Sequence, residues 1–294
     1  MIYQTAAAYQ EAPSRAVALV GMSGLGKTTT ARMLRAEDEW FHYSVDYRIG
    51  TRYMGEHITD NFKREAMKNP FLRDLLRSDS IYIASNITFE NLAPLSTYLG
   101  KPGDPAKGGI AFSEYMRRQR QHREAEIAAL TDTIEFIDKA RDIYRYAHFL
   151  ADTGGSICEV LAPDDPGDAL MRSLSAHLLI VQIRGTEALA DELVYRFRRD
   201  PKPMYYPEDL LERLWAEYRR QHDVPEDRVD PDDFAVWGFR ALIDHRVPRY
   251  DAIGRWGVTV EAHEIAALRR PADFDALIAD AIERRGPGAA RATG

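Results

Sequence analysis

The sequence predicts an α/β fold with three layers, in which helices cover both faces of a mainly parallel sheet. Residues 16–34 form an apolar strand pattern, a glycine-rich turn and then a helix pattern. Further short apolar runs recur along the chain, and helical spacing of apolar residues follows most of them. Strands that alternate with helices are typical of parallel sheets, because the chain must cross over between neighbouring strands.

The composition is that of an ordinary globular protein. The chain has 294 residues, of which 45% are hydrophobic and 29% charged, enough for one large domain or a core with insertions. A net charge of −7 does not favour binding to nucleic acid. The single cysteine, Cys158, excludes a disulfide framework and a cysteine-rich zinc site. No apolar run approaches a membrane span and no signal peptide is recognisable, so we expect a cytoplasmic protein.

The first strand and helix enclose a phosphate-binding loop. Residues 21–28 match G-x-x-x-x-G-K-[ST] in full. Such a loop turns backbone N–H groups toward a phosphate; Lys27 would reach the β- and γ-phosphates, and the Thr28 hydroxyl would ligate Mg²⁺. We therefore expect ATP and Mg²⁺ as ligands. The predicted cofactor-binding residues are Gly21, Ser23, Gly24, Leu25, Gly26, Lys27, Thr28 and Thr29.

The second strand pattern, residues 40–46, is aromatic-rich and ends in Asp46. Ligand groups gather at the carboxyl ends of parallel strands, so this carboxylate could take a proton from an acceptor hydroxyl or hold Mg²⁺ through water. An aspartate that caps a helix is the alternative. Arg48 and Arg52 follow, and are candidates for gripping an anionic acceptor or else solvated surface arginines.

A long, mainly helical stretch comes next. Residues 56–99 predict helices with a break at Pro70, and a short strand over 81–84. Residues 100–109 predict a flexible loop, either a mobile lid or a connector. Residues 112–146 predict one long helix or two, whose basic run is either a solvated face or a site that attracts anions.

The next apolar strand pattern resembles a Walker B strand. It runs from Ala147 to Asp152, whose carboxylate would support Mg²⁺. Gly154 and Gly155 follow and allow the backbone to approach a ligand closely. The alternative is a tight turn into a helix, capped by Asp152 or Ser156.

The C-terminal half continues the alternation of strands and helices. Arg198, Arg199 and Lys202 lie in a basic segment beside a proline-flanked loop, which is typical of a lid that closes over a triphosphate. Arg246 opens the segment Arg-Val-Pro-Arg-Tyr. The remaining predicted elements are a strand over 177–183, helices over 187–197, 207–220 and 234–245, a loop over 221–233, a strand over 257–260 and a helix over 272–284.

Together these pieces resemble the shikimate kinase family, within the nucleoside-monophosphate-kinase-like group of phosphate-loop proteins. The phosphate loop at 21–28 is the specific match, and Asp46 matches the family acid that contacts the acceptor hydroxyl, while Ser44 replaces a second, metal-side acid. Residues 152–156 are similar to the family's glycine-rich substrate turn, and Lys202-Pro203-Met204 to its lid. The resemblance implies that Arg246 grips a substrate carboxylate, as the arginine of the family's Arg-x-Pro-x-Tyr motif does.

The resemblance implies a phosphate-loop kinase fold that transfers the γ-phosphoryl group of ATP to a hydroxyl of an anionic small molecule. The predicted catalytic residues are Lys27, Asp46, Lys202, Arg198 and Arg199, the substrate-binding residues Asp46, Arg48, Arg52, Gly154, Gly155 and Arg246, and the metal residues Thr28 and Asp152. The predicted organisation is a leader over 1–15, a kinase-like domain over 16–285 with helical insertions at about 53–146 and 207–240, and a disordered tail over 286–294.

Two alternatives remain open from the sequence. A nucleotide or nucleoside kinase would use the helical insertion and its arginines to bind a base and a phosphate. A nucleotide-dependent switch would present the charged helix pattern at 112–146 to a macromolecular partner.

Overall fold

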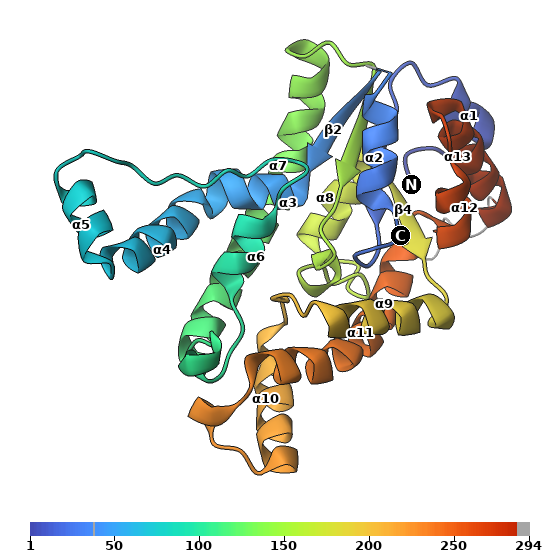
Figure 1. Cartoon of the computed structure of the whole chain (residues 1–294). Coiled ribbons are helices and arrows are strands. Elements are labelled where there is room, and N and C mark those ends of the chain that lie inside the picture. The colour runs from blue at the N-terminus through green and yellow to red at the C-terminus, as the bar shows by residue number, and fades with distance from the viewer. Residues whose placement is uncertain (38, 287–294) are drawn as a thin grey trace. The chain divides into compact units, whose positions relative to one another are not determined.

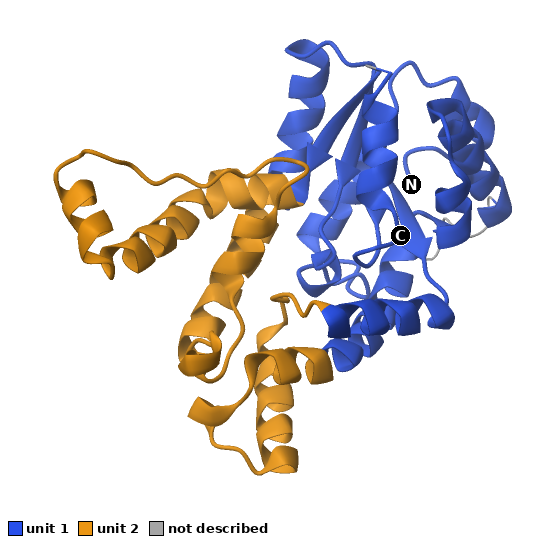
Figure 2. Cartoon of the chain, viewed as in Figure 1, with its two compact units in different colours: residues 1–45, 130–199, 239–294 blue, residues 46–129, 200–238 orange. Residues whose placement is uncertain are grey.

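A computed structural model describes residues 1–37 and 39–286 of the chain. The chain divides into two compact units (Figure 2). The first, here called the sheet unit, comprises residues 1–45, 130–199 and 239–294, and the second, here called the helical unit, comprises residues 46–129 and 200–238. Apart from Gly286, the predicted tail lies outside the described residues.

The sheet unit is built on a five-stranded, wholly parallel sheet of order β2-β3-β1-β4-β5. β1 is therefore the central strand. In its pairing with β3, Leu19 lies opposite Asp152, and in its pairing with β4, Val20 lies opposite Gln182. The strands are β1 (Ala16–Val20), β2 (Trp40–Ser44), β3 (His148–Asp152), β4 (Leu179–Arg184) and β5 (Val258–Glu261).

The strands are apolar because they are buried along their length. Every residue of β1 and β3 is buried, as is each residue of β4 before Arg184. Continuous apolar runs of this kind are expected of parallel strands, which carry no solvent-facing side. The mainly parallel sheet is thus confirmed, while the three-layer arrangement stays a prediction.

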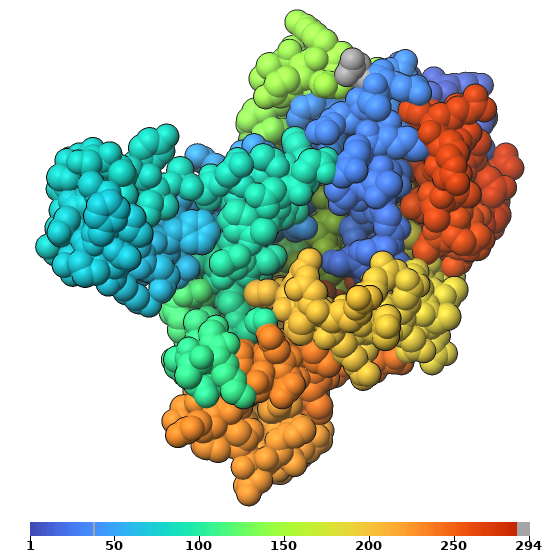
Figure 3. Space-filling view, in the orientation of Figure 1, coloured from blue at the N-terminus to red at the C-terminus, as the bar shows by residue number. Residues whose placement is uncertain are grey.

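The predicted leader contributes one short helix, α1, to the sheet unit. This helix packs on α13, and the Tyr9 hydroxyl donates a 2.9 Å hydrogen bond to Asp275. The C-terminal helices accordingly border the N-terminal segments in the ribbon and space-filling views (Figures 1 and 3). The helices are α1 (Ala6–Gln10), α2 (Lys27–Arg35), η3 (Ile157–Glu159), α8 (Ala169–His177), α9 (Glu187–Arg199), α12 (Ala262–Ala267) and α13 (Pro271–Arg285).

The helical unit has no named strand among its described residues. In the described part of the chain, no helix is both long and apolar enough to cross a membrane. The elements of this unit are η1 (Ile49–Tyr53), α4 (Gly55–Met67), α5 (Pro70–Arg77), α6 (Ala93–Leu99), η2 (Pro105–Lys107), α10 (Glu208–His222) and η4 (Glu226–Arg228); α3 (Val45–Arg48), α7 (Phe112–Asp142) and α11 (Pro231–Gly254) each contain residues of both units.

The two segments of the helical unit pack against each other. The rings of Phe112 and Trp215 stack with their centroids 4.8 Å apart, and the Tyr115 hydroxyl donates to the Met204 carbonyl at 2.7 Å. At Gly103, an added Cβ would lie 2.4 Å from the carbonyl oxygen of Val229, so the two backbones touch there. The larger parts of the two predicted insertions, residues 53–129 and 207–238, therefore share one unit.

Three local predictions need correction. Residues 81–84 form no strand, because the chain there runs outside any sheet, with Tyr82 89% exposed. The second strand ends at Ser44, and Asp46 lies in the first turn of α3 instead of in the strand. The segment that begins at Arg246 continues α11 through Pro248, although proline removes one hydrogen bond from a helix interior. The break predicted at Pro70 is confirmed, since this proline begins α5.

Candidate active site

The phosphate loop joins the carboxyl end of β1 to the start of α2. Gly24 and Gly26 have φ angles of +87° and +92°, a left-handed backbone that favours glycine. Gly26 occupies the N-cap position of α2, so the positive end of the helix and its unpaired N–H groups face the loop. The loop therefore has two positions, Gly24 and Gly26, whose backbone conformation only glycine adopts readily.

Lys27 lies against the loop that precedes it. Its side chain is 6% exposed, and its Nζ donates hydrogen bonds to the carbonyl oxygens of Gly21 at 2.6 Å and Met22 at 2.9 Å. The ammonium group is therefore held against the carbonyls of the loop, and its predicted role in neutralising phosphate oxygens stays a prediction.

Thr28 and Asp152 meet at the carboxyl ends of the central strands. The Thr28 hydroxyl donates to Asp152 Oδ2 at 2.8 Å. Asp152 is 6% exposed, and His42 Nε2 on β2 lies 3.7 Å from the same oxygen. The pairing of β1 with β3 explains the contact, because it places the last residue of β3 beside the start of the phosphate loop.

This pair has the chemistry that a magnesium site needs. Mg²⁺ prefers hard oxygen ligands and in phosphate-loop proteins takes most of them from phosphates and water. A hydroxyl and a carboxylate oxygen within 2.8 Å of each other fit that requirement. Within residues 1–37 and 39–286, no group of three or more histidine, cysteine or acidic side chains could hold a metal.

The turn after β3 touches the phosphate loop. The Thr153 hydroxyl donates to the carbonyl of Leu19 at 2.7 Å. At Gly155, an added Cβ would lie 2.2 Å from Ser23 Oγ and 3.0 Å from the Ser23 nitrogen. A side chain there would displace the Ser23 hydroxyl and press on the Ser23 backbone nitrogen, so glycine at position 155 is explained by contact with the chain's own loop.

A buried ionic cluster that the sequence did not reveal lies next to this turn. The Glu159 side chain is fully buried; its two oxygens contact Arg246 Nε at 2.8 Å and His245 Nε2 at 3.1 Å, and Arg249 Nε lies 3.6 Å away. Arg246 also donates from Nη1 to the carbonyl of Gly155 at 2.8 Å. The contacts of Arg246 in the sheet unit thus include the chain's own carboxylate, and its predicted role in holding a substrate stays a prediction.

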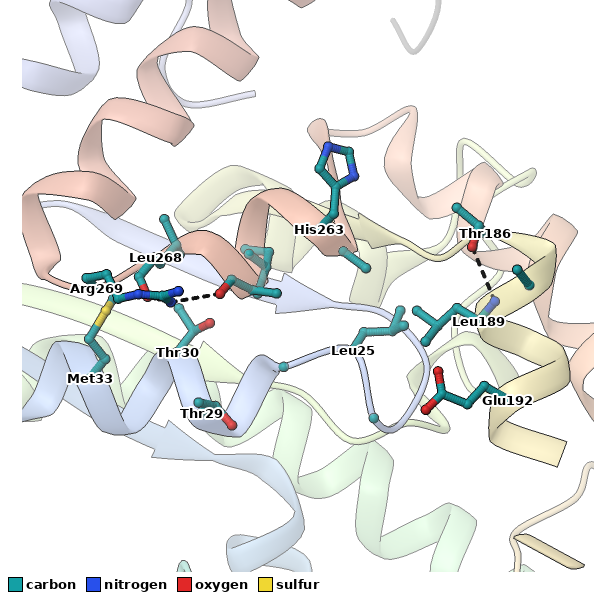
Figure 4. A pocket seen from close by; sticks show the side chains of 16 residues that line it. Leu25, Thr29, Thr30, Met33, Thr186, Leu189, Glu192, His263, Leu268 and Arg269 are labelled. Carbon is teal, nitrogen blue, oxygen red and sulfur yellow. Dashed lines mark hydrogen bonds between the residues drawn. The ribbon is translucent and has the colours of Figure 1, made fainter. Parts of the chain in front are cut away.

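A cavity of about 840 Å³ opens beside the phosphate loop. It lies between the loop and α2 on one side and α9 and α12 on the other, with Leu25 and Leu189 close together and His263 pointing away from the loop (Figure 4). A mostly apolar cavity with a few polar groups is typical of small-molecule sites. Leu25 and Thr29 were predicted from the sequence as binding residues, but the opposite wall of the cavity, formed by α9 and α12, was not predicted. Side chains that line the cavity include Leu25, Met33, Leu189, Ile265, Leu268 and Arg269.

Other predicted site residues are divided between the two units. Arg198 and Arg199 are exposed in the last turn of α9, in the sheet unit. In the helical unit, the Arg48 guanidinium lies 5.7 Å from the ring of Tyr53, and Lys202 Nζ lies 3.5 Å from Asp200. Asp46 and Arg52 belong to the same short helical segment as Arg48, so these three predicted acceptor residues are close along one stretch of chain.

The sequence matches no protein-family model, and no curated protein matches it. Among solved structures, the chain is similar to the 1.7 Å crystal structure of shikimate kinase from Bacteroides thetaiotaomicron, with 14% sequence identity and a TM-score of 0.38. That alignment covers 91% of this chain and 94% of the other. A likeness of this degree carries no argument about activity.

Proposed function

We propose that the protein is an ATP-dependent phosphotransferase that moves the γ-phosphoryl group to a hydroxyl of an anionic small molecule. The contact between Thr28 and Asp152 carries the proposal, because it joins a complete phosphate loop to an acid on the neighbouring strand. This is the arrangement that phosphate-loop enzymes use to bind a triphosphate with its Mg²⁺.

The phosphate loop supplies positioning and charge. Backbone N–H groups of the loop and the start of α2 would bind the β- and γ-phosphates, with Lys27 neutralising their charge. Thr28 and Asp152 would hold Mg²⁺, which lowers the charge that develops on the phosphate oxygens. Since phosphoryl transfer needs little covalent chemistry from the protein, these groups would supply much of the catalysis.

The neighbouring cavity would take the nucleoside part of ATP. Its apolar side chains would cover the faces of a base, and Arg269 has its Nη1 fixed by the carbonyls of Ala266 and Leu268, at 2.9 and 3.0 Å. A guanidinium held in this way would stack on the flat face of a base. The cavity borders Gly24 and Gly26, so the phosphates would continue into the loop.

The acceptor side of the proposal keeps the roles predicted from the sequence. Asp46 would orient or deprotonate the acceptor hydroxyl, and Arg48, Arg52 and Arg246 would hold its anionic group. Lys202, with Arg198 or Arg199, would neutralise the phosphoryl group in transfer. Gly154 and Gly155 would border the acceptor.

Purified protein should form ADP from Mg·ATP faster when the correct acceptor is present. The screen should pair hydroxy acids and sugar phosphates with nucleosides and nucleoside monophosphates. Lys27→Met should abolish turnover, whereas Lys68→Ala, a change at a 71% exposed side chain, should not. Stimulation by nucleoside monophosphates alone would favour the nucleotide kinase, and steady hydrolysis that no small molecule stimulates would favour the switch. Failure to bind any nucleoside triphosphate would overturn the proposal.

A further inference from the structure

One face of α11 holds the segment that follows β3. Arg246 Nη1 donates to the carbonyl of Gly155, and Arg249 Nε donates to the carbonyl of Cys158 at 2.7 Å. Arg249 Nη2 also donates to the carbonyl of Leu161 at 3.3 Å. These are contacts from side chains to backbone carbonyls, so they fix the path of the chain whatever side chains it carries.

Glu159 holds the arginines of α11 in place. Its side chain has no exposed surface, and its oxygens contact Arg246 Nε and His245 Nε2 and lie near Arg249. A buried carboxylate is tolerated only when it is paired and hydrogen-bonded, and an arginine fork is oriented by the carboxylate that it meets. The Arg246 side chain is 5% exposed. Loss of the negative charge of Glu159 would therefore leave this buried arginine without its carboxylate.

The segment that follows β3 in turn contacts the phosphate loop. Gly155 accepts the hydrogen bond from Arg246 through its carbonyl, and its Cα is so close to Ser23 that an added Cβ would lie 2.2 Å from the serine hydroxyl. Asp152, the partner of Thr28, is the last residue of β3 and lies three residues before Gly155 in the chain. A shift of the turn would therefore move Gly155, which lies against Ser23, next to the strand end that carries Asp152.

We propose that Glu159 and Arg246 are positioning residues for the phosphate loop. Arg246 links the Glu159 carboxylate to the Gly155 backbone, and Gly155 supports the loop at Ser23. The proposal rests on the proposed function in one respect, namely that the loop binds a nucleotide. It assigns the cluster an effect on loop geometry that is separate from any contact with an acceptor.

The test uses Glu159→Gln, which keeps the size of the side chain but removes its charge, and Arg246→Lys, which keeps the charge but removes the fork. Asp275→Asn is the control, because Asp275 also pairs with an arginine, Arg15, and accepts from Tyr9, but does so where α13 meets α1 and the segment before β1. The measurements are the affinity for Mg·ADP by calorimetry, hydrogen exchange of the amides of residues 21–26, the labelling rate of Cys158, and the melting temperature.

Both cluster variants should bind Mg·ADP at least about tenfold more weakly, the scale on which outer partners of a binding site commonly act. Their loop amides should exchange faster, and Cys158 should label faster, than in the control. Asp275→Asn should lower the melting temperature but keep the affinity within about twofold, as expected for independent sites.

Weaker stability with unchanged affinity and unchanged loop exchange in both cluster variants would overturn the proposal and leave the cluster a purely structural one. If Glu159→Gln does not fold, Arg246→Lys decides the question with the same measurements. If the wild-type protein binds no Mg·ADP, the proposed function fails, while the exchange of the loop amides still shows whether the cluster positions the loop.

Discussion

The hydroxyl of Thr28 lies 2.8 Å from Asp152 Oδ2, although the two residues are 124 positions apart in the chain. One belongs to the first turn of α2 and the other ends β3. The parallel pairing of β1 with β3 brings them together, because a parallel sheet gathers the carboxyl ends of its strands at one edge.

Asp152→Asn should weaken the dependence of nucleotide binding on magnesium. An asparagine keeps an oxygen that can accept from Thr28 but loses the charge that attracts a divalent cation. Wild-type protein should bind ADP about 10 to 100 times more weakly after Mg²⁺ is removed with EDTA, and the variant should show little change. Calorimetric titrations with and without Mg²⁺ measure both. Asp138→Asn, at a side chain 66% exposed, is the control, and an unaltered magnesium effect in Asp152→Asn would contradict the assignment.

Gly155→Ala and Gly257→Ala should both destabilise the sheet unit but differ in nucleotide binding. The added Cβ would lie 2.2 Å from Ser23 Oγ in the first and 1.8 Å from the carbonyl of Ile180 in the second. Overpacking of this kind costs about 1–3 kcal/mol or more. Gly257 precedes β5, at the opposite end of the strands from the phosphate loop, so only Gly155→Ala should lower affinity for Mg·ADP. Thermal melts and calorimetry separate the effects; equal affinity losses would contradict this prediction.

Glu114 should make the free energy of unfolding of the helical unit depend on pH in the acidic range. The hydrogen bond from Arg117 lowers the pKa of Glu114 to about 2, burial opposes this change, and the hydrogen bond from Arg118 adds to it. Because the carboxylate has a lower pKa in the folded state, its stabilisation is complete above the unfolded value of 4.5 and disappears as pH falls toward 2.

The corresponding experiment compares Glu114→Gln with wild type by urea unfolding at a series of pH values. The variant should be less stable at neutral pH, and the difference should shrink below pH 4.5. Glu135→Gln, at a side chain 62% exposed that pairs with Lys139, should have a small effect at any pH. A stability difference for Glu114→Gln that stays constant down to acid pH would show that the charge of this carboxylate is not the cause.

Cys158 should be inert toward thiol reagents in the folded protein. Burial raises the pKa of its thiol from 9.0 to about 12, and the residue has no exposed surface. Near pH 8 the thiolate fraction should be about a thousandfold smaller than for a thiol of ordinary pKa, and only the thiolate reacts. Labelling with a chromogenic disulfide should therefore be very slow in buffer and fast in guanidinium chloride. Similar rates in both conditions would contradict the buried position. Because the chain has a single cysteine, the signal has one source.

Local patterns in the sequence determined the glycine-rich turn before α2, the strands at β1, β3, β4 and β5, and the break at Pro70. These features depend on residues that are neighbours in the chain: glycines at fixed spacing, continuous apolar runs and a proline that suits the first turn of a helix. The sequence also predicted that Thr28 and Asp152 belong to one site, because both follow strands whose carboxyl ends share an edge.

Only the tertiary structure decided which distant groups meet. Apolar periodicity reports that a residue is buried but does not identify its partner, so the pairing of Glu159 with Arg246 was invisible, and the opposite wall of the cavity was not predicted. For the same reason, the segment that begins at Arg246 was not recognised as helix: the packing of Tyr250 and Ile253 into the core stabilises α11 on the far side of a proline that local preference would treat as an end. Contacts across the fold outweighed local propensity at these positions, and such contacts arise only once the chain is folded.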